Sequence, residues 1–136
     1  MNRYYNQNYT EEEIARILQT IKGCIASGEY QIALNRNRPE NLEFVAEYGL
    51  NVRKQKEILM SIAVRDFCHS LQNMKPGYEH ETLFVFVPQV TLLSVGDEEE
   101  TVSVYTKFNI IERRGGTTTI VISFHKCNRP AEYLFR

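Results

Sequence analysis

The spacing of hydrophobic residues changes near the middle of the chain. Before Gly77, apolar residues recur every three or four positions, which is typical of amphipathic helices. After Gly77 they alternate with a period of two, which is typical of β-strands. Helices followed by strands predict an α+β fold, in which N-terminal helices pack on one face of a small antiparallel sheet.

The first predicted helix has the clearest start and stop signals. Thr10 and Glu13 have the spacing of a capping box, and Gly28 is placed to end the helix. Its apolar stripe consists of Ile14, Ile17, Leu18, Ile21 and Ile25. Residues 1–9 are rich in Asn and Tyr and show no periodicity, which predicts a flexible N-terminal arm. No linker or repeat interrupts residues 10–136, so they are predicted to form a single domain.

Two shorter helices are expected before residue 77. Pro39 can begin the second helix and Gly49 can end it. Its inward residues are predicted to be Leu42, Val45 and Tyr48. Asn51 is placed to cap the third helix. The buried face of that helix is predicted to be Ile58, Leu59 and Ile62. Residues 29–34 alternate as a short strand would, and residues 64–71 fit either a helix or a strand.

The C-terminal half predicts a series of antiparallel strands. Residues 83–93 form the first strand region, and the acidic run 97–100 lies in the turn after it. The two longest strands, 102–110 and 119–126, are joined through a turn at 113–116 whose glycines can supply positive φ.

Alternation assigns faces to these last two strands. One face of the final strand carries Val121, Ser123 and His125, and the other carries Ile120, Ile122 and Phe124. In the preceding strand Tyr105, Lys107 and Asn109 share a face. These polar residues lie beside Ser123 and His125 if the register allows. Lys126 faces away from His125 unless the chain bends there. An ordinary solvent-facing side of the sheet is the alternative interpretation.

Composition narrows the range of functions only a little. Apolar residues make up 43% of the 136 residues, charged residues 24%, and the net charge is −1. The overall charge therefore predicts no nucleic-acid partner. Residues 101–136, however, carry six Lys or Arg against two acids, a local charge of +4, and Asp97–Glu100 before them contributes −4. A basic face of this kind suits a polyanion, although solvated surface charge is the more common interpretation.

The cysteines and the hydropathy favour a cytoplasmic protein. Cys24, Cys68 and Cys127 are an odd number at unrelated spacings, which indicates reduced thiols. The start of the chain does not read as a signal peptide, and no apolar run approaches the roughly 18 residues of a membrane span.

Several motifs in the second half of the chain resemble a known protein family. The motifs are Val104–Phe108 (VYTKF), Ile122–His125 (ISFH), Arg129–Pro130 and Tyr133–Phe135 (YLF). Together they resemble the C-terminal signature of the MqsR family of bacterial type II toxins, which have a RelE-like fold. Asp66–Leu71 (DFCHSL) resembles the segment that precedes the sheet in that family. The resemblance covers residues 60–136 at the level of motifs, and the earlier residues only by pattern.

The resemblance implies an activity and a partner. Members of the family are endoribonucleases that cleave mRNA without a metal and are held inactive by an antitoxin. The chain is therefore expected to be a RelE-like mRNA interferase that needs no cofactor and binds a cognate antitoxin protein.

The resemblance also implies catalytic residues. The strand tyrosine of the family falls on Tyr105 and the nearby lysine on Lys107. The position after the Ser-Phe pair falls on His125, and the upstream polar position falls on His69. Some relatives have lysine at these two histidine positions. A lysine is mainly a cation, whereas a histidine with a pKa near 6.5 also moves protons at neutral pH. His125 is thus expected to be a general acid or base, with His69 as its candidate partner.

The expected chemistry defines the remaining roles. The ribose 2′-hydroxyl attacks the adjacent phosphate, so a base, an acid and stabilising cations are needed. Lys107 and Lys126 are the expected cations, and Tyr105 is a proton donor or a hydrogen-bonding support. Arg129 is a weaker candidate for a phosphate contact. Tyr78, in a loop, is the expected stacking residue for RNA. Phe84 and Phe86 more often belong to the core.

Other interpretations remain open. His69 is as readily a loop histidine without a role. The chain can also be a non-enzymatic module that binds RNA or protein, or a phage-type inhibitor that acts through its acidic loop. A Cys68 nucleophile lacks an orienting group, and no cysteine or histidine spacing supports zinc. Gly115 and Gly116 lack the context of a phosphate-binding loop.

Overall fold

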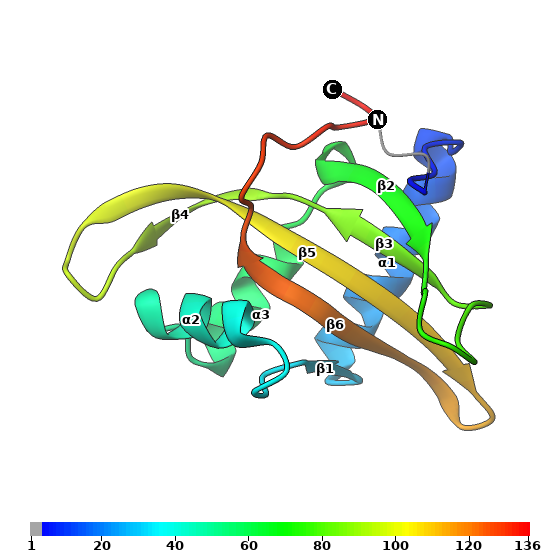
Figure 1. Ribbon diagram of the computed structural model, residues 1–136, viewed down its shortest axis with the longest axis horizontal. Coiled ribbons are helices and arrows are strands. Elements are labelled where there is room, and N and C mark those ends of the chain that lie inside the picture. Colours follow the sequence, from blue (N-terminus) through cyan, green and yellow to red (C-terminus); the bar gives the residue numbers. More distant parts are fainter. Residues whose placement is uncertain (1–3) are drawn as a thin grey trace.

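The computed structural model describes residues 4–136 and confirms an α+β fold. Its helices are α1 (Glu11–Ser27), α2 (Pro39–Glu47), α3 (Val52–Met60) and the short 3-10 helix η1 (Val64–Asp66). Its strands are β1 (Tyr30–Ile32), β2 (Phe67–Gln72), β3 (Thr82–Phe86), β4 (Gln89–Leu93), β5 (Glu99–Arg113) and β6 (Gly116–Lys126). The helices lie on one side of the sheet (Figure 1). Residues 64–71, which the sequence left open, form η1 and most of β2.

The strands make one mixed sheet in the order β1-β6-β5-β3-β2, and β4 pairs with the first half of β5. Most pairs are antiparallel, as predicted, but β1 runs parallel to β6. The prediction of a purely antiparallel sheet is therefore wrong for this pair, because the helices between β1 and β2 carry the chain away before β6 returns. The hairpin of β4 and β5 projects from the body as an arm (Figure 1).

The predicted helix caps are confirmed. The backbone N–H of Glu13 donates to Thr10 Oγ1 at 3.1 Å, and the backbone N–H of Thr10 donates to Glu13 Oε1 at 2.8 Å. Gly28 ends α1 in the left-handed conformation at φ 81°. Asn51 caps α3 by accepting from the Lys54 backbone N–H at 2.9 Å. These caps involve neighbours only three residues apart, so the sequence is sufficient to predict them.

The inward face of α2 agrees with the prediction at Val45 and Tyr48, which pack in the large core, but not at Leu42. Leu42 is 41% exposed, whereas Asn41 and Phe44 are buried. Asn41 Nδ2 donates to the carbonyls of Ala33 and Ile122, and its Oδ1 accepts from the Phe124 N–H. Asn41 therefore satisfies backbone groups of β6, and this gain orients the helix with a polar residue inside.

A β-bulge lies in β6 next to the groups that Asn41 binds, just beyond the last pair of β1 with β6, Ile32 and Val121. Lys107 pairs with Ser123 but Phe108 pairs with Val121, so Ile122 has no partner on β5. The bulge reverses the alternation before it. Val121 is fully buried in the main core, and Ile120 is on the opposite face and half-buried. The predicted faces of Ile120 and Val121 are therefore wrong, while those of Ser123 and His125 are unaffected.

Each face of the sheet has its own hydrophobic cluster. The large core lies between the helices and the sheet, where Phe67, Phe86, Phe108 and Phe124 are the largest fully buried side chains. A much smaller cluster lies on the opposite face, which we call the open face. Its buried members are Cys68, Val85 and Val87.

Both ends of the described chain contact the sheet near the small cluster. Asn6 forms an antiparallel bridge with Ser70, and Gln7 Nε2 donates to the Cys68 carbonyl at 2.8 Å. At the other end, the Tyr133 hydroxyl donates to the Val87 carbonyl at 2.7 Å. The C-terminal segment extends from the end of β6 (Figure 1), and Leu134 and Phe135 near its end pack against the large core. The predicted arm 1–9 did not anticipate these contacts of residues 4–9, and its first three residues lie outside the described part.

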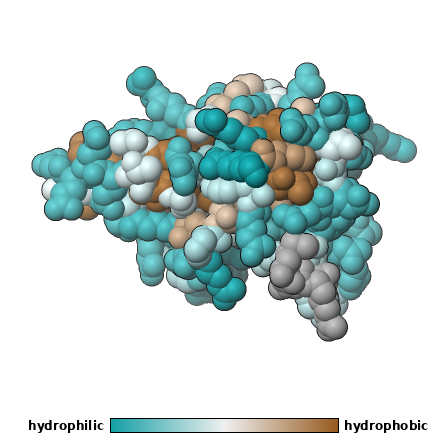
Figure 2. Space-filling model, turned by 90° about the horizontal axis from the view of Figure 1, so that it is seen from above, coloured by the Kyte–Doolittle hydropathy of each residue, from teal (hydrophilic) through white to brown (hydrophobic). Residues whose placement is uncertain are grey.

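The surface is mostly hydrophilic in the view of Figure 2, with hydrophobic atoms exposed among hydrophilic ones on the projecting arm. Leu93 and Val95, at the end of that arm, are 57% and 72% exposed. Within residues 4–136, no helix is both long enough and apolar enough to span a bilayer.

Candidate functional site

The Tyr105 and His125 side chains form a pair on the open face. The two residues are direct cross-strand partners on β5 and β6. Their rings stack with centroids 5.3 Å apart and an interplanar angle of 19°. The structure thus confirms the register on which the predicted neighbourhood of these residues depended.

The backbone fixes the tautomer of His125. Its Nδ1 lies 2.9 Å from the carbonyl oxygen of Lys126. A carbonyl can only accept, so Nδ1 carries the proton and donates it to this bond. In the neutral imidazole the lone pair is then on Nε2. His125 therefore has a ring nitrogen that can accept a proton from a ligand.

Lys107 lies on the same face, two residues after Tyr105 in β5. It pairs with Ser123, two residues before His125. Burial lowers the pKa of Lys107, and the charge of Arg38 lowers it further. Within residues 4–136, no carboxylate forms an ion pair with Lys107. The Arg38 charge is thus near enough to act on Lys107, and no ion pair within residues 4–136 neutralises either side chain, which is an arrangement suited to an anion.

Arg38 was not predicted as a site residue. It belongs to the turn before α2, which is about 70 positions from Lys107 in the sequence, and nothing local connects the two. The basic turn 35–38 was visible in the sequence, but only the fold brings Arg38 near β5.

Lys126 lies on the opposite, helix-facing side, as strict alternation implies. Its Nζ is 2.7 Å from Glu47 Oε2 and 5.1 Å from the centre of the Tyr48 ring. The hydrogen bond to Glu47 raises the pKa of Lys126. The bend that would place Lys126 beside His125 is absent, so its predicted role at the same phosphate as Lys107 is wrong.

His69 is on the open face but far from His125. It is on β2, and β3 and β5 separate that strand from β6. Three strand spacings amount to about 14 Å between the backbones. The structure therefore does not bring the two imidazoles together, and the prediction of an acid–base histidine pair is wrong.

The surroundings of His69 keep it neutral. Its side chain is 7% exposed, and the Tyr5 ring stacks on it with centroids 3.6 Å apart. Burial, and to a lesser extent the charge of Lys107, lowers the pKa of His69 to about 4. Its Nε2 has no hydrogen-bond partner within the described residues, which is unusual for a buried polar atom.

A cavity of about 220 Å³ lies beside Tyr105. It is lined by Tyr5, Cys68, His69, Val85, Val87, Tyr105, Cys127 and residues 129–132. Burial is the main cause that raises the pKa of Tyr105 to about 12, with smaller contributions from Tyr5 and the two cysteines. Burial also raises the pKa of Cys68 to about 12, which keeps it a thiol and argues against a nucleophilic role. The predicted Arg129 is exposed and contributes to the cavity wall.

Tyr78 does not line this cavity. It is 44% exposed in the loop between β2 and β3, and Lys75 Nζ lies 5.0 Å above its ring. A base can reach this ring from solvent, but the structure does not connect Tyr78 with the Tyr105–His125 pair.

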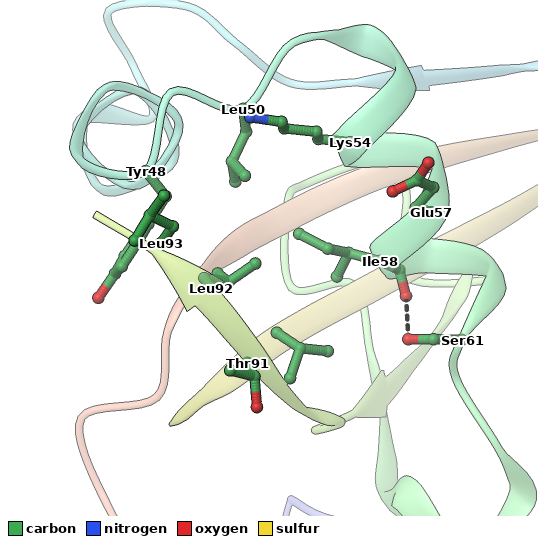
Figure 3. Close-up of a pocket in the computed structure, with 10 residues that line it drawn as sticks. Tyr48, Leu50, Lys54, Glu57, Ile58, Ser61, Thr91, Leu92 and Leu93 are labelled. Carbon is green, nitrogen blue, oxygen red and sulfur yellow. Dashed lines mark hydrogen bonds between the residues drawn. The ribbon is translucent and has the colours of Figure 1, made fainter. Parts of the chain in front are cut away.

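A second hollow, of about 340 Å³, lies between α3 and β4. Figure 3 shows Leu50, Ile58 and Leu92 directed into it, with the Ser61 hydroxyl donating to the Ile58 carbonyl. None of the predicted site residues lines it. Elsewhere within residues 4–136, no group of three or more His, Cys, Asp or Glu side chains is arranged to hold a metal ion.

No family model, no curated protein and no solved structure matches this chain. The geometry of the open face is therefore the main indication of what the protein does.

Proposed function

We propose that the protein is an endoribonuclease toxin that cleaves mRNA by attack of the ribose 2′-hydroxyl on the adjacent phosphate. The observation that carries the proposal is the Tyr105–His125 pair, with the His125 Nε2 available and Lys107 on the same face. The resemblance of these strands to the MqsR family is consistent with it. Each chemical requirement of the reaction has a candidate group on this face of the sheet.

His125 is the proposed general base. The Lys126 carbonyl holds the proton on Nδ1, so Nε2 is the atom that accepts the proton of the 2′-hydroxyl. A positioned base of this kind typically contributes about 10²- to 10⁴-fold to the rate. His69 is too far away to share the step, so His125 acts with Tyr105 instead.

Lys107 and Arg38 are the proposed phosphate-binding cations. Lys107 is half-buried and has no acidic partner within the described residues, so its charge is not already neutralised. Charge that develops on the phosphoryl oxygens is stabilised more strongly in such a partly desolvated site than in water.

Tyr105 is the proposed proton donor to the leaving 5′-oxygen. Because its pKa is raised to about 12, the hydroxyl stays protonated throughout the physiological pH range. A phenol is still a stronger acid than the alcohol that forms when the 5′-oxygen leaves, so the proton transfer is downhill. This division of roles needs no metal ion.

The decisive experiment is to incubate the purified protein with a defined single-stranded RNA in EDTA and to identify the product ends. We expect a 2′,3′-cyclic phosphate and a free 5′-hydroxyl, with the rate reduced about 10²- to 10⁴-fold in His125→Ala. The matched control is His80→Gln, because His80 is an exposed loop histidine outside the site.

Intact RNA after incubation with the folded parent protein would refute the proposal. RNA bound but not cut would instead identify a non-enzymatic binding module. Circular dichroism and thermal unfolding of each variant must match the parent, so that loss of activity reports on chemistry rather than on folding.

A cognate antitoxin protein is part of the same proposal, because an unregulated mRNA nuclease would arrest growth of its own cell. We expect expression of the parent alone, but not of His125→Ala, to stop growth. Co-expression of the product of a neighbouring small gene would restore it. Equal growth with parent and variant would contradict the toxin assignment.

A further inference from the structure

We propose that the cavity beside Tyr105 is a subsite for one unpaired nucleobase of the RNA, next to the phosphate that is cut. This inference rests on the proposed function. It adds a base-binding cavity that the sequence did not predict. It also assigns to His69 a role in binding rather than in proton transfer.

The walls of the cavity suit a planar ring. Val85 and Val87 are fully buried in its apolar floor, and Ala131 from the C-terminal segment packs against the same cluster. Tyr5 and Tyr105 add aromatic surface. A volume of about 220 Å³ is below the range of about 300–1,000 Å³ for drug-sized ligands, so a single small ring system fits better than a larger molecule.

The polar atoms of the cavity suit the edge of a base. His69 is 7% exposed, and its Nε2 has no partner within the described residues. A buried polar atom without a partner costs about 1–3 kcal/mol, and a base that hydrogen-bonds to it recovers that cost. Because His69 is neutral, its Nε2 either donates or accepts one hydrogen bond, according to the tautomer, and the edge of a base offers partners of both kinds.

The position of the cavity links it to the cleavage site. Tyr105 lines the cavity and also stacks on His125, so a single side chain separates the two. A nucleotide whose base occupies the cavity therefore has its ribose and phosphate near His125. Arg129 and Glu132 are exposed at the cavity wall, where they can contact the polar edge of the base or the backbone leading to it.

Tyr5 supports the same assignment. Its ring stacks on His69 with centroids 3.6 Å apart and an interplanar angle of 7°, and Tyr5 itself lines the cavity, where an aromatic ring can contact a base. Both rings of the stacked pair line the cavity, and the contact restricts the orientation of the imidazole.

The test measures binding separately from cleavage. The four nucleoside 3′-monophosphates are titrated into the His125→Ala protein by calorimetry, and the His69 ring signals are followed by NMR. We expect at least one nucleotide to bind and to shift those signals. His69→Phe in the same background keeps the ring and the stack but removes both nitrogens, and should weaken that binding about tenfold.

A second variant guards against misfolding of the first. Ala131→Leu fills the cavity from the C-terminal segment and should weaken all four nucleotides, whereas His80→Gln should leave their binding unchanged. No binding to the folded protein, or equal binding by the parent and both cavity variants, would overturn the inference.

The two proposals fail in different ways. If RNA is cleaved but His69→Phe changes neither KM nor the base preference at the cut, the nucleobase subsite is wrong and the nuclease assignment stands. If nucleotides bind in the cavity but RNA is not cut, the cavity is a nucleobase site of a binding protein, and both the nuclease assignment and the placement of the site beside a cut phosphate are wrong.

Discussion

The two faces of the sheet are built from the same alternating strands, yet they are covered in different ways. The helix-facing side buries an aromatic core in which neighbouring rings contact edge to face, such as Phe44 with Phe124 at 5.2 Å and Phe86 with Phe108 at 5.9 Å. The open face buries only a small cluster around Val85, and the two ends of the chain cover it.

The helix-facing side mainly stabilises the fold, whereas the open face carries the candidate functional groups. Three helices can fill the space over one face closely, so that face supplies most of the hydrophobic free energy of folding. Short irregular segments cover the other face less completely. The open face therefore keeps a cavity and partly desolvated polar groups such as Lys107. These features can bind a ligand but contribute little to the stability of the fold.

The largest expected contrast concerns two lysines on opposite faces. Lys107→Ala should lower the rate of RNA cleavage about 10²-fold, because it removes a cation that stabilises the phosphoryl oxygens in a partly desolvated site. Lys126→Ala should change the rate less than twofold, because Lys126 is paired with Glu47 on the helix-facing side. Initial rates on one defined RNA test both variants. Equal losses would show that the faces are not functionally distinct.

The stability of the two clusters should differ in the same direction as their size. Phe124→Ala should reduce the free energy of unfolding by about 3–5 kcal/mol, because it empties part of the main core. Val85→Ala removes two methyl groups beside an existing cavity and should cost about 2 kcal/mol. Urea denaturation measures both. A larger cost at Val85 would contradict the assignment of the helix-facing core as the main source of stability.

The open face should also make folding sensitive to acid. In the unfolded chain His69 is protonated near its ordinary pKa of 6.5. In the folded protein its pKa is lowered to about 4, so it is protonated only at a lower pH. The free energy of unfolding is therefore unaffected by the protonation of His69 above pH 6.5. It decreases by on the order of 3 kcal/mol as the pH falls from 6.5 to 4, because protons bind to the unfolded chain first.

The variant His69→Phe isolates this contribution from that of the carboxylates. Its free energy of unfolding should fall less steeply than that of the parent between pH 6.5 and 4, in denaturation series at several pH values. His80→Gln, at an exposed loop histidine, should follow the parent. A His69→Phe curve parallel to the parent would mean that His69 is not held neutral by burial.

The smallest expected effect concerns the cover of the open face. Tyr133→Phe removes the hydrogen bond from the tyrosine hydroxyl to the Val87 carbonyl and should cost about 1 kcal/mol. The loss should be local, so hydrogen exchange should speed up in residues 130–136 while β5 and β6 stay protected. Uniformly faster exchange across the sheet would show that the C-terminal segment belongs to the main folding unit.

Much of the fold could be predicted from neighbouring residues. The caps at Thr10, Gly28 and Asn51 depend on contacts within one helical turn. Strand alternation placed Tyr105, Lys107 and His125 on one face, and the register confirms it. Strict alternation predicted the wrong faces for Ile120 and Val121. The bulge at Ile122 reverses the facing of the side chains before it in β6.

The orientation of α2 was not predictable in the same way. Hydrophobicity favoured Leu42 as the inward residue, but Asn41 hydrogen-bonds to backbone groups of β6 that lie beyond the end of β1. The gain from those bonds depends on a strand more than 80 positions away. No local pattern around residue 41 contains that information.

The sequence by itself determined the three α-helices, the β5–β6 hairpin and the shared face of Tyr105, Lys107 and His125, because the interactions that fix them join residues close together in the chain. Only the tertiary structure decided that His69 is separated from His125, that Arg38 lies near Lys107, and that Tyr5 and the C-terminal segment enclose a cavity. These arrangements depend on the order of strands in the sheet and on contacts between distant segments, whose free energy exists only when the whole chain has folded.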